Sequence, residues 1–228
     1  MGLISIIHPS RSRPSLAYKT ASLWLANPGC EFEYILSLDE DDPVHYQYAH
    51  GFPFGKNAKV ITQKNRSAID AINKAASICN GEIIIVISDD FIPFNNWGKN
   101  IFLEMRRKAD WILKTEDGIQ NWIITLPIMD RIYYKRFGYI YHPSYRHAFC
   151  DTEMTCVAEL TGCKQVSPMM FPHLNKPGTK IMDTVQERND ATFDEGMRKF
   201  IDRKKNNFGL PESDIVGRMT PNIYTQMQ

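Results

Sequence analysis

Two adjacent carboxylates follow a fully apolar stretch of the chain. Residues 83–87 are five β-branched residues in a row, and Ser88, Asp89 and Asp90 come directly after them. An apolar run without polar alternation is typical of a strand buried on both faces of a parallel sheet. Ionised carboxylates at the end of such a strand need compensation, from a divalent cation with oxygen ligands or from the N–H groups of a turn. An Asx turn that only closes the strand is the alternative interpretation.

Three further side chains stand where a site is expected. Asp39 is the first acid after a second expected strand at 32–38, so it should lie at the sheet edge where open α/β sheets bind ligands. Asp151 stands at the expected start of a helix, where it is either a general base or only a helix cap. His173 lies in a loop, and a lone histidine is more often structural than a ligand.

A strand, a turn and a helix are expected at the N-terminus. Residues 3–8 predict the strand, residues 9–14 form a polar turn with two arginines, and Pro14 suits the first turn of a helix that ends near residue 26. The N–H groups of such a turn, together with the helix dipole, attract phosphate. A solvated turn is the alternative for the two arginines.

The hydrophobic pattern predicts an α/β protein. Strands are expected at 3–8, 32–38, 58–62, 83–87, 111–114, 122–126 and 164–167, and helices at 14–26, 67–79, 97–107, 129–137, 151–160 and around 193–201. The strands at 58–62 and 83–87 flank a helix, so this β-α-β unit should have parallel strands. Residues 44–57 are expected to form a loop that could fold over a ligand.

Composition excludes several classes of protein. The 228 residues include 27 basic and 26 acidic ones, a smaller basic excess than a whole-surface nucleic-acid binder would have, so no nucleic-acid partner is expected. Five scattered cysteines without a C-x-x-C pair favour a reduced, cytoplasmic protein. No apolar run is long enough for a membrane span. A helix near residues 193–201 has basic neighbours; it should pack on the domain, or else make a peripheral membrane contact.

Taken in order, these segments resemble glycosyltransferases of the A-type (GT-A) fold, most closely the family 2-like, inverting group. The residues that carry the resemblance are 4–11, 38–39, 64–70, 80–90, 149–153 and 171–173. The similarity covers about residues 3–180. It implies a Rossmann-like fold, with a mostly parallel central sheet, helices on both faces and a small antiparallel region on the acceptor side.

The resemblance also implies roles for particular residues. Those expected in the nucleotide-sugar pocket are Pro9, Ser10, Arg13, Asp39, Arg66, Ser88 and Asp89. Asp90 and His173 match the metal-binding positions, Asp151 matches the general base of inverting members, and Glu153 is a second candidate for that base. Ser88 departs from the family's D-x-D motif, which leaves open whether Asp89 contacts the ribose or the metal.

The implied reaction transfers a sugar from a UDP- or GDP-type donor to an acceptor hydroxyl on a glycan or another molecule, with Mn²⁺ or Mg²⁺ as cofactor. Residues 1–182 would form the transferase domain, with a nucleotide half at 1–92 and an acceptor half at 93–182, and residues 183–228 a C-terminal helix and tail. The alternatives are a sugar-phosphate nucleotidyltransferase, whose glycine-rich signature residues 9–12 lack, and an inactive nucleotide-sugar-binding module. No dinucleotide or P-loop motif is present.

Overall fold

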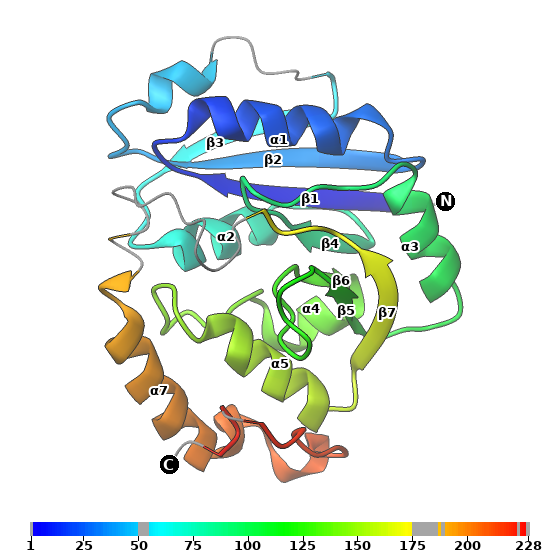
Figure 1. Ribbon diagram of the computed structural model, residues 1–228, viewed down its shortest axis with the longest axis vertical. Coiled ribbons are helices and arrows are strands. Elements are labelled where there is room, and N and C mark those ends of the chain that lie inside the picture. Colours follow the sequence, from blue (N-terminus) through cyan, green and yellow to red (C-terminus); the bar gives the residue numbers. More distant parts are fainter. Residues whose placement is uncertain (1, 50–54, 175–186, 188–189, 223, 227–228) are drawn as a thin grey trace.

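The computed structural model describes residues 2–49, 55–174, 187, 190–222 and 224–226. A sheet of seven strands runs through the molecule in the order β3-β2-β1-β4-β6-β5-β7 (Figure 1). The strands are β1 (Leu3–Ser10), β2 (Glu31–Asp39), β3 (Ala58–Gln63), β4 (Ile83–Val86), β5 (Ile112–Glu116), β6 (Ile128–Asp130) and β7 (Lys164–Met170). Within this sheet only β6 is antiparallel to its neighbours. The expected mostly parallel α/β architecture is therefore confirmed.

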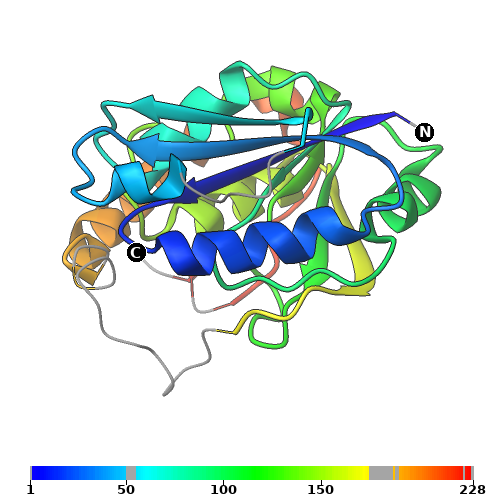
Figure 2. The same ribbon diagram turned by 90° about the horizontal axis from the view of Figure 1, so that it is seen from above.

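Helices cover both faces of this sheet. They are α1 (Pro14–Ala26), α2 (Ala68–Ser77), α3 (Trp97–Met105), α4 (Arg131–Phe137), α5 (Cys150–Leu160) and α7 (Phe193–Lys205), with short 3-10 turns η1 (His45–Ala49), η2 (Asn207–Gly209) and η3 (Glu212–Asp214). Helices α1 and α3 share one hydrophobic cluster, and α2, α4, α5 and α7 share the other. Figure 2 shows α1 on the opposite side of the sheet from α2.

The central strand β4 explains the apolar run in the sequence. Ile83, Ile85 and Ile87 pack into the cluster under α1 and α3, while Ile84 and Val86 pack into the cluster under α2 and α5. Successive side chains of a strand point to opposite faces, and here both faces are covered. Burial of each of these side chains contributes roughly 1.5–3 kcal/mol, so a polar residue within the run would be costly. The carboxylates can begin only where the strand ends.

Helix α2 starts where its capping residue predicts. Ser67 is extended, and its hydroxyl accepts a hydrogen bond from the N–H of Asp70 at 3.4 Å. This cap satisfies one of the free N–H groups of the first turn. It also fixes the turn between β3 and α2, so that Arg66 and Ser67 lie at the same edge of the sheet as the end of β4.

The prediction of a strand at residues 122–126 was wrong. All of these residues are described, and they belong to a loop between β5 and β6. Polar groups of this loop bond to the side chain of Asp117 instead of to a neighbouring strand. Asp117 accepts hydrogen bonds from the N–H groups of Ile119 and Gln120, both at 2.7 Å, and from the Thr125 hydroxyl at 2.6 Å. The antiparallel strand of this region is β6 instead.

The helix expected from residue 129 begins later, at Arg131. Asp130 ends β6 and caps α4, because its carboxylate accepts a hydrogen bond from the N–H of Tyr133 at 2.8 Å. One side chain therefore ends the strand and starts the helix. A strand of three residues is too short to produce a periodic signal, which is why the sequence pattern assigned Met129 to the helix.

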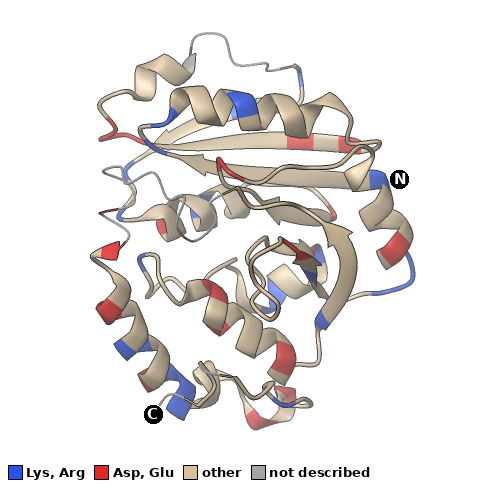
Figure 3. Cartoon of the chain, in the orientation of Figure 1, with Lys and Arg blue, Asp and Glu red and all other residues tan. Residues whose placement is uncertain are grey.

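The C-terminal helix α7 packs on the core through its apolar face. Phe200 is fully buried, and Met197 and Ile201 pack against the same cluster. Figure 3 shows acidic as well as basic residues along α7. Most of the apolar face is covered, although Phe193 is 52% exposed, and this packing agrees with a helix that lies on the domain. No described helix is long and apolar enough to cross a membrane. The boundary expected at residues 182–183 lies outside the described residues.

Candidate active site

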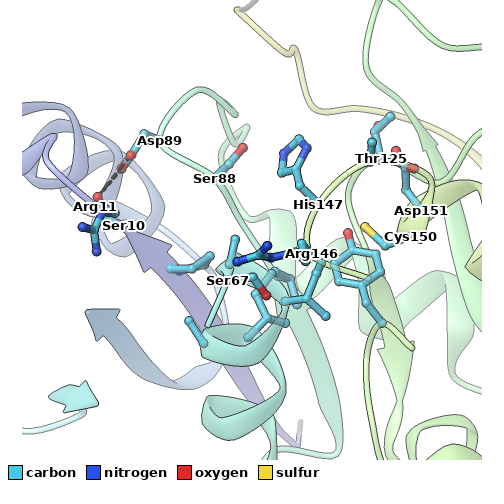
Figure 4. Close-up of a pocket in the computed structure, with 18 of the residues that line it drawn as sticks. Ser10, Arg11, Ser67, Ser88, Asp89, Thr125, Arg146, His147, Cys150 and Asp151 are labelled. Carbon is cyan, nitrogen blue, oxygen red and sulfur yellow. Dashed lines mark hydrogen bonds between the residues drawn. The ribbon is translucent and has the colours of Figure 1, made fainter. Parts of the chain in front are cut away.

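A cavity of about 960 Å³ opens at the carboxyl ends of β1, β2 and β4. It extends from these strands to the first turn of α5 and to the start of α7. Figure 4 shows Ser10 and Asp89 at one side of this cavity, and Thr125 and Asp151 at the other. Every site residue expected from the sequence lines it except Glu153; the ten are Pro9, Ser10, Arg13, Asp39, Arg66, Ser88, Asp89, Asp90, Asp151 and His173.

Asp39, the last residue of β2, is held in place by two donors. Its side chain accepts one hydrogen bond from the Arg11 guanidinium at 2.8 Å and one from the Asn65 amide at 2.9 Å. Asp39 is only 7% exposed, so this ion pair is partly desolvated. Burial lowers the pKa of Arg11, but the hydrogen bonds that Arg11 donates to Asp41 and Asp39 outweigh burial and raise that pKa. These two hydrogen bonds fix the carboxylate of Asp39 at the cavity wall.

Asp89 is engaged with β1. Its Oδ1 lies 2.9 Å from Nε2 of the fully buried His8, and it accepts a second hydrogen bond from the Ser10 hydroxyl, whose closer contact is 3.1 Å. Nδ1 of His8 lies 2.5 Å from the hydroxyl of Tyr34. Burial, together with the Asp89 charge, raises the pKa of Tyr34, so its hydroxyl stays protonated. His8 thus links the Tyr34 hydroxyl to the Asp89 carboxylate through its two ring nitrogens.

Asp90 faces the cavity beside His173. Its Oδ2 lies 2.9 Å from Nε2 of His173, and its Oδ1 accepts a hydrogen bond from the Ser88 hydroxyl. The His173 ring stacks on Phe91, with ring centroids 4.4 Å apart, and the two residues form a β-bridge. Burial raises the pKa of Asp90, but the hydrogen bond and charge of His173 and the Ser88 hydroxyl outweigh it, so the pKa is lowered. Asp90 is therefore ionised at neutral pH.

The Asp90–His173 pair fits two positions of a divalent cation. Adjacent ligands of an octahedral ion at about 2.1 Å are about 3 Å apart, and the two donor atoms here are 2.9 Å apart. Among the described residues there is no group of three His, Cys, Asp or Glu side chains that could hold a metal by themselves. A bound cation would therefore need oxygen ligands from a substrate and from water, as Mg²⁺ sites on phosphates commonly have.

Asp151 lies across the cavity from the strand ends, in the first turn of α5. Its Oδ1 accepts hydrogen bonds from the N–H of Thr152 at 2.7 Å and from the Thr152 hydroxyl at 3.3 Å. Burial raises the pKa of Asp151 more than these bonds and the charge of His147 lower it. Helix α5 begins after Phe149, whose φ of 69° lies in the left-handed region. A carboxylate with a raised pKa is a stronger base, so Asp151 can accept a proton from a hydroxyl in the cavity.

Glu153, the second candidate for a base, does not lie in this cavity. It is 3% exposed and forms an ion pair with Arg203 of α7, with 2.8 Å between Nε and Oε2. Its Oε2 also accepts a hydrogen bond from the Tyr145 hydroxyl at 2.7 Å. Residues two apart on a helix are rotated by about 200°, so Asp151 and Glu153 point in different directions. The position of Glu153 supports a structural role and argues against a role as base.

The arginines expected near the donor differ in their surroundings. Arg13 lies at the start of α1, where its backbone N–H donates to the Tyr48 hydroxyl at 3.0 Å. The Arg66 side chain is 74% exposed and lies 3.5 Å from Asp70. The exposed side chain of Arg66 can therefore reorient toward a ligand. The side chains of Asp39 and Asp89 are instead held by hydrogen bonds.

Several lining residues were missed from the sequence. They are Arg11, Gln120, Thr125, Arg146, His147, Thr192 and Glu195. Arg11 belongs to the polar turn whose phosphate-binding character was noted, so its charge was the available signal. The others come from irregular loops or from the start of α7, where hydrophobic periodicity carries no information about direction.

The sequence profile of glycosyl transferase family 2 matches residues 5–150, which include the strand ends and the start of α5. The chain belongs to this family. No curated protein matches the sequence.

Solved glycosyltransferases share the fold. The mannosyltransferase PcManGT from Pyrobaculum calidifontis, in complex with GDP-Man and Mn²⁺, matches with a TM-score of 0.70 at 11% identity, over 90% of this chain and 64% of that chain. S. aureus TarS 1–349 in complex with UDP matches with a TM-score of 0.60 at 17% identity, over 74% and 59% of the two chains. The TarS complex with UDP-GlcNAc matches at 0.59 and 14%, over 89% and 74%. The GT-A fold implied by the resemblance is confirmed, and this family 2 chain spans less than two thirds of the mannosyltransferase chain.

Proposed function

We propose that this family 2 protein transfers a sugar from a nucleotide diphosphate sugar to an acceptor hydroxyl, with inversion at the anomeric carbon. The observation that carries the proposal is the placement of Asp90 with His173 and of Asp151 on different walls of one cavity. Inversion by direct displacement needs the leaving diphosphate and the base on opposite sides of the sugar. Acids on separate walls of the cavity suit that requirement.

The donor would bind at the strand ends. Asp39, held by Arg11 and Asn65, would accept hydrogen bonds from the nucleotide base, and Pro9 and Ser10 would line the same pocket. Arg13 and the largely exposed side chain of Arg66 would approach the phosphates of the donor. Asp90 and His173 would hold a Mn²⁺ or Mg²⁺ ion, which when bound neutralises charge on the diphosphate. The two kinds of solved relatives bind GDP- and UDP-linked compounds, so both donors are candidates.

Asp151 would perform the proton transfer. The acceptor oxygen attacks the anomeric carbon while the Asp151 carboxylate takes the hydroxyl proton, and the bond between the anomeric carbon and the diphosphate oxygen breaks. The products are the glycosylated acceptor and the nucleotide diphosphate, which leaves with the bonding electron pair. Asp151 then releases its proton to water. The raised pKa of Asp151 makes the carboxylate a better proton acceptor than an ordinary aspartate.

Asp89 would support this site without touching the donor's metal. It accepts hydrogen bonds from His8 and Ser10, which turn its carboxylate toward β1. Of the two alternatives that the Ser88 substitution leaves open, this arrangement favours a contact with the ribose, or a purely structural role, over a metal ligand. Asp90 would then be the acidic metal ligand of the motif.

The test starts from binding, because the donor is unidentified. Purified protein is titrated with UDP and with GDP in the presence and absence of Mn²⁺, and unfolding temperature and calorimetric heat are measured. Mn²⁺-dependent binding of one nucleotide, followed by release of that nucleotide from its sugar conjugate, is the expected result. Release of pyrophosphate from a nucleoside triphosphate and a sugar phosphate would instead identify a nucleotidyltransferase. Binding without any turnover, in the presence of a panel of acceptor sugars, would identify an inactive binding module.

A further inference from the structure

The C-terminal helix α7 lies outside the residues matched by the family profile, yet it holds the segment that carries Asp151. Nε of Arg203 donates to Oε2 of Glu153 at 2.8 Å, and Nη2 donates to Oε1 at 2.8 Å. Nη2 also donates to the carbonyl of Phe208 at 2.8 Å, which orients the guanidinium from behind. The result is a two-pronged ion pair between α7 and the first turns of α5, two residues beyond Asp151.

Three further contacts join α7 to residues 144–149. Gly196 lies against the backbone carbonyl of Ala148, where an added Cβ would come within 2.4 Å of the oxygen. Lys199 donates from Nζ to the carbonyl of Ser144. Phe149 packs between Phe193 and Phe200, with ring centroids 5.1 and 5.7 Å away. The helix therefore touches this segment at both of its ends.

The segment held in this way forms the acceptor-side wall of the cavity. Arg146, His147 and Asp151 line the cavity, and each lies within three residues of a contact with α7. Phe149 is in the left-handed backbone region just before α5, a conformation that persists when the surroundings support it. Tyr145 adds a bond from the segment to the same Glu153 carboxylate, at 2.7 Å.

We infer that α7 is a positioning element of the active site, and that the Arg203–Glu153 pair sets the place of Asp151 relative to the donor. The inference rests on the proposed function of Asp151 as the base. Arg203 and Glu153 touch no substrate in this arrangement; they act through the first turn of α5 and through Tyr145. A displacement of a catalytic group by about 1 Å costs on the order of 100-fold in rate, so a change in this pair should appear in kcat.

A second ion pair, between α5 and the first residue of β7, separates positioning from simple stabilisation. Glu159 and Lys164 form an ion pair of 2.7 Å, with side chains 8% and 13% exposed, against 4% and 21% for Glu153 and Arg203. Glu159 lies eight residues beyond Asp151, about 12 Å along the helix axis. Lys164→Met should therefore destabilise the protein as Arg203→Met does, but without moving Asp151.

The kinetic test compares these two variants below their unfolding temperatures. We expect Arg203→Met to lower kcat by about 10- to 100-fold with the donor KM changed by less than about twofold, and Lys164→Met to leave both within about twofold. Arg203→Lys keeps one charged donor, so its kcat should lie between the two. Equal kcat in Arg203→Met and Lys164→Met would overturn the inference. If Arg203→Met does not fold, Gly196→Ala, which crowds the Ala148 carbonyl, is used with the same criteria.

Hydrogen exchange tests the same inference without any turnover. In the wild type and the two variants, amide exchange is measured by mass spectrometry for peptides that cover residues 144–155. Faster exchange there in Arg203→Met (or Gly196→Ala) but not in Lys164→Met supports positioning by α7; unchanged exchange refutes it. If the wild type turns over no nucleotide sugar, the proposed function fails, while the exchange result still decides whether α7 holds this segment.

Discussion

The carboxylates on the two sides of the cavity differ in their hydrogen-bonding and ion-pair partners. On the strand side, Asp39 is paired with Arg11, Asp89 with His8, and Asp90 with His173. On the helix side, Asp151 accepts hydrogen bonds only from its neighbour Thr152 among the described residues. Burial acts on both sides, but partners outweigh it for Asp90 and do not for Asp151.

This difference assigns separate chemical tasks to the two sides. A lowered pKa keeps Asp90 ionised, which a cation ligand requires, and a raised pKa makes Asp151 a better proton acceptor. Titratable groups whose surroundings shift their pKa values apart are a common sign of divided acid–base roles. The predictions below test whether the two sides behave in these different ways.

The largest effect is expected at Asp151. Asp151→Asn keeps the shape of the side chain but cannot take a proton, so kcat should fall by about 10²–10⁴-fold while the donor dissociation constant stays nearly unchanged. In the wild type, kcat/KM should rise with pH through a pKa above 3.8, and this limb should be lost in the variant. Initial rates against pH and calorimetric titration of the donor measure both quantities. A variant with wild-type rates would remove Asp151 from the chemistry.

The next effect is expected at Asp90, where binding should change instead. Asp90→Asn removes a charged cation ligand, and we expect Mn²⁺-dependent affinity for the nucleotide diphosphate to fall by at least about 100-fold, the upper end of what loss of an outer-shell partner costs. Affinity measured without Mn²⁺ should change little. Titrations at several Mn²⁺ concentrations provide the comparison. Equal Mn²⁺ dependence in the two proteins would contradict a cation site at Asp90 and His173.

A smaller effect on binding is expected at Asp39. Asp39→Ala removes the acceptor for the nucleotide base and leaves Arg11 and Asn65 without a shared partner, so donor affinity should fall by roughly tenfold, as loss of a charged hydrogen bond does. The kcat value at saturating donor should stay within a few-fold. Steady-state kinetics over a range of donor concentrations separates the two constants. A fall in kcat alone would assign Asp39 to the chemistry.

The smallest effect is on stability, and its sign differs between the two sides. The raised pKa of Asp151 means that its contribution to stability is present below 3.8 and lost as pH rises through the raised value, so Asp151→Asn should raise the melting temperature at pH 7. The lowered pKa of Asp90 means that its contribution is present above 3.8 and lost as pH falls through the lowered value, so Asp90→Asn should lower it.

The sign of each shift is the expected result, and 1 kcal/mol of stability corresponds to about 2–4 °C for a chain of this size. Thermal unfolding of both variants, followed from pH 7 to below pH 4, measures the two signs and their loss at low pH. Shifts of the same sign at pH 7 would mean that the two carboxylates do not have opposite surroundings. The measurement needs neither donor nor acceptor.

Local patterns were sufficient for the strand side of the site. The apolar run at 83–87 predicted a strand buried on both faces, and the acids that follow it lie at its carboxyl end. A helix was expected from residue 67, and Ser67 caps α2 by accepting a hydrogen bond from the N–H of Asp70. These features depend on residues close together in the sequence, so periodicity and capping chemistry contain them.

The helix side depended on contacts between distant residues. Asp151 and Glu153 were both candidates for a base, because each stands near the start of the same helix. Arg203, fifty residues further along the chain, forms an ion pair with Glu153, whereas Asp151 lines the cavity. Likewise, the N–H of Ile124, in the loop where a strand was expected, donates to the hydroxyl of Thr155 on α5. No local pattern records such partners.

The sequence by itself determined the family, the parallel strands β1 to β4 and the acids at their ends, because burial on two faces and capping depend on residues close together in the chain. Only the tertiary structure decided which carboxylates are paired and which are not. It buried Glu153 against α7 and paired Asp39, Asp89 and Asp90 across neighbouring strands and loops, while Asp151 has only local bonds within the described part of the chain. Pairing and burial set the pKa of a carboxylate, and both depend on which segments the fold brings together.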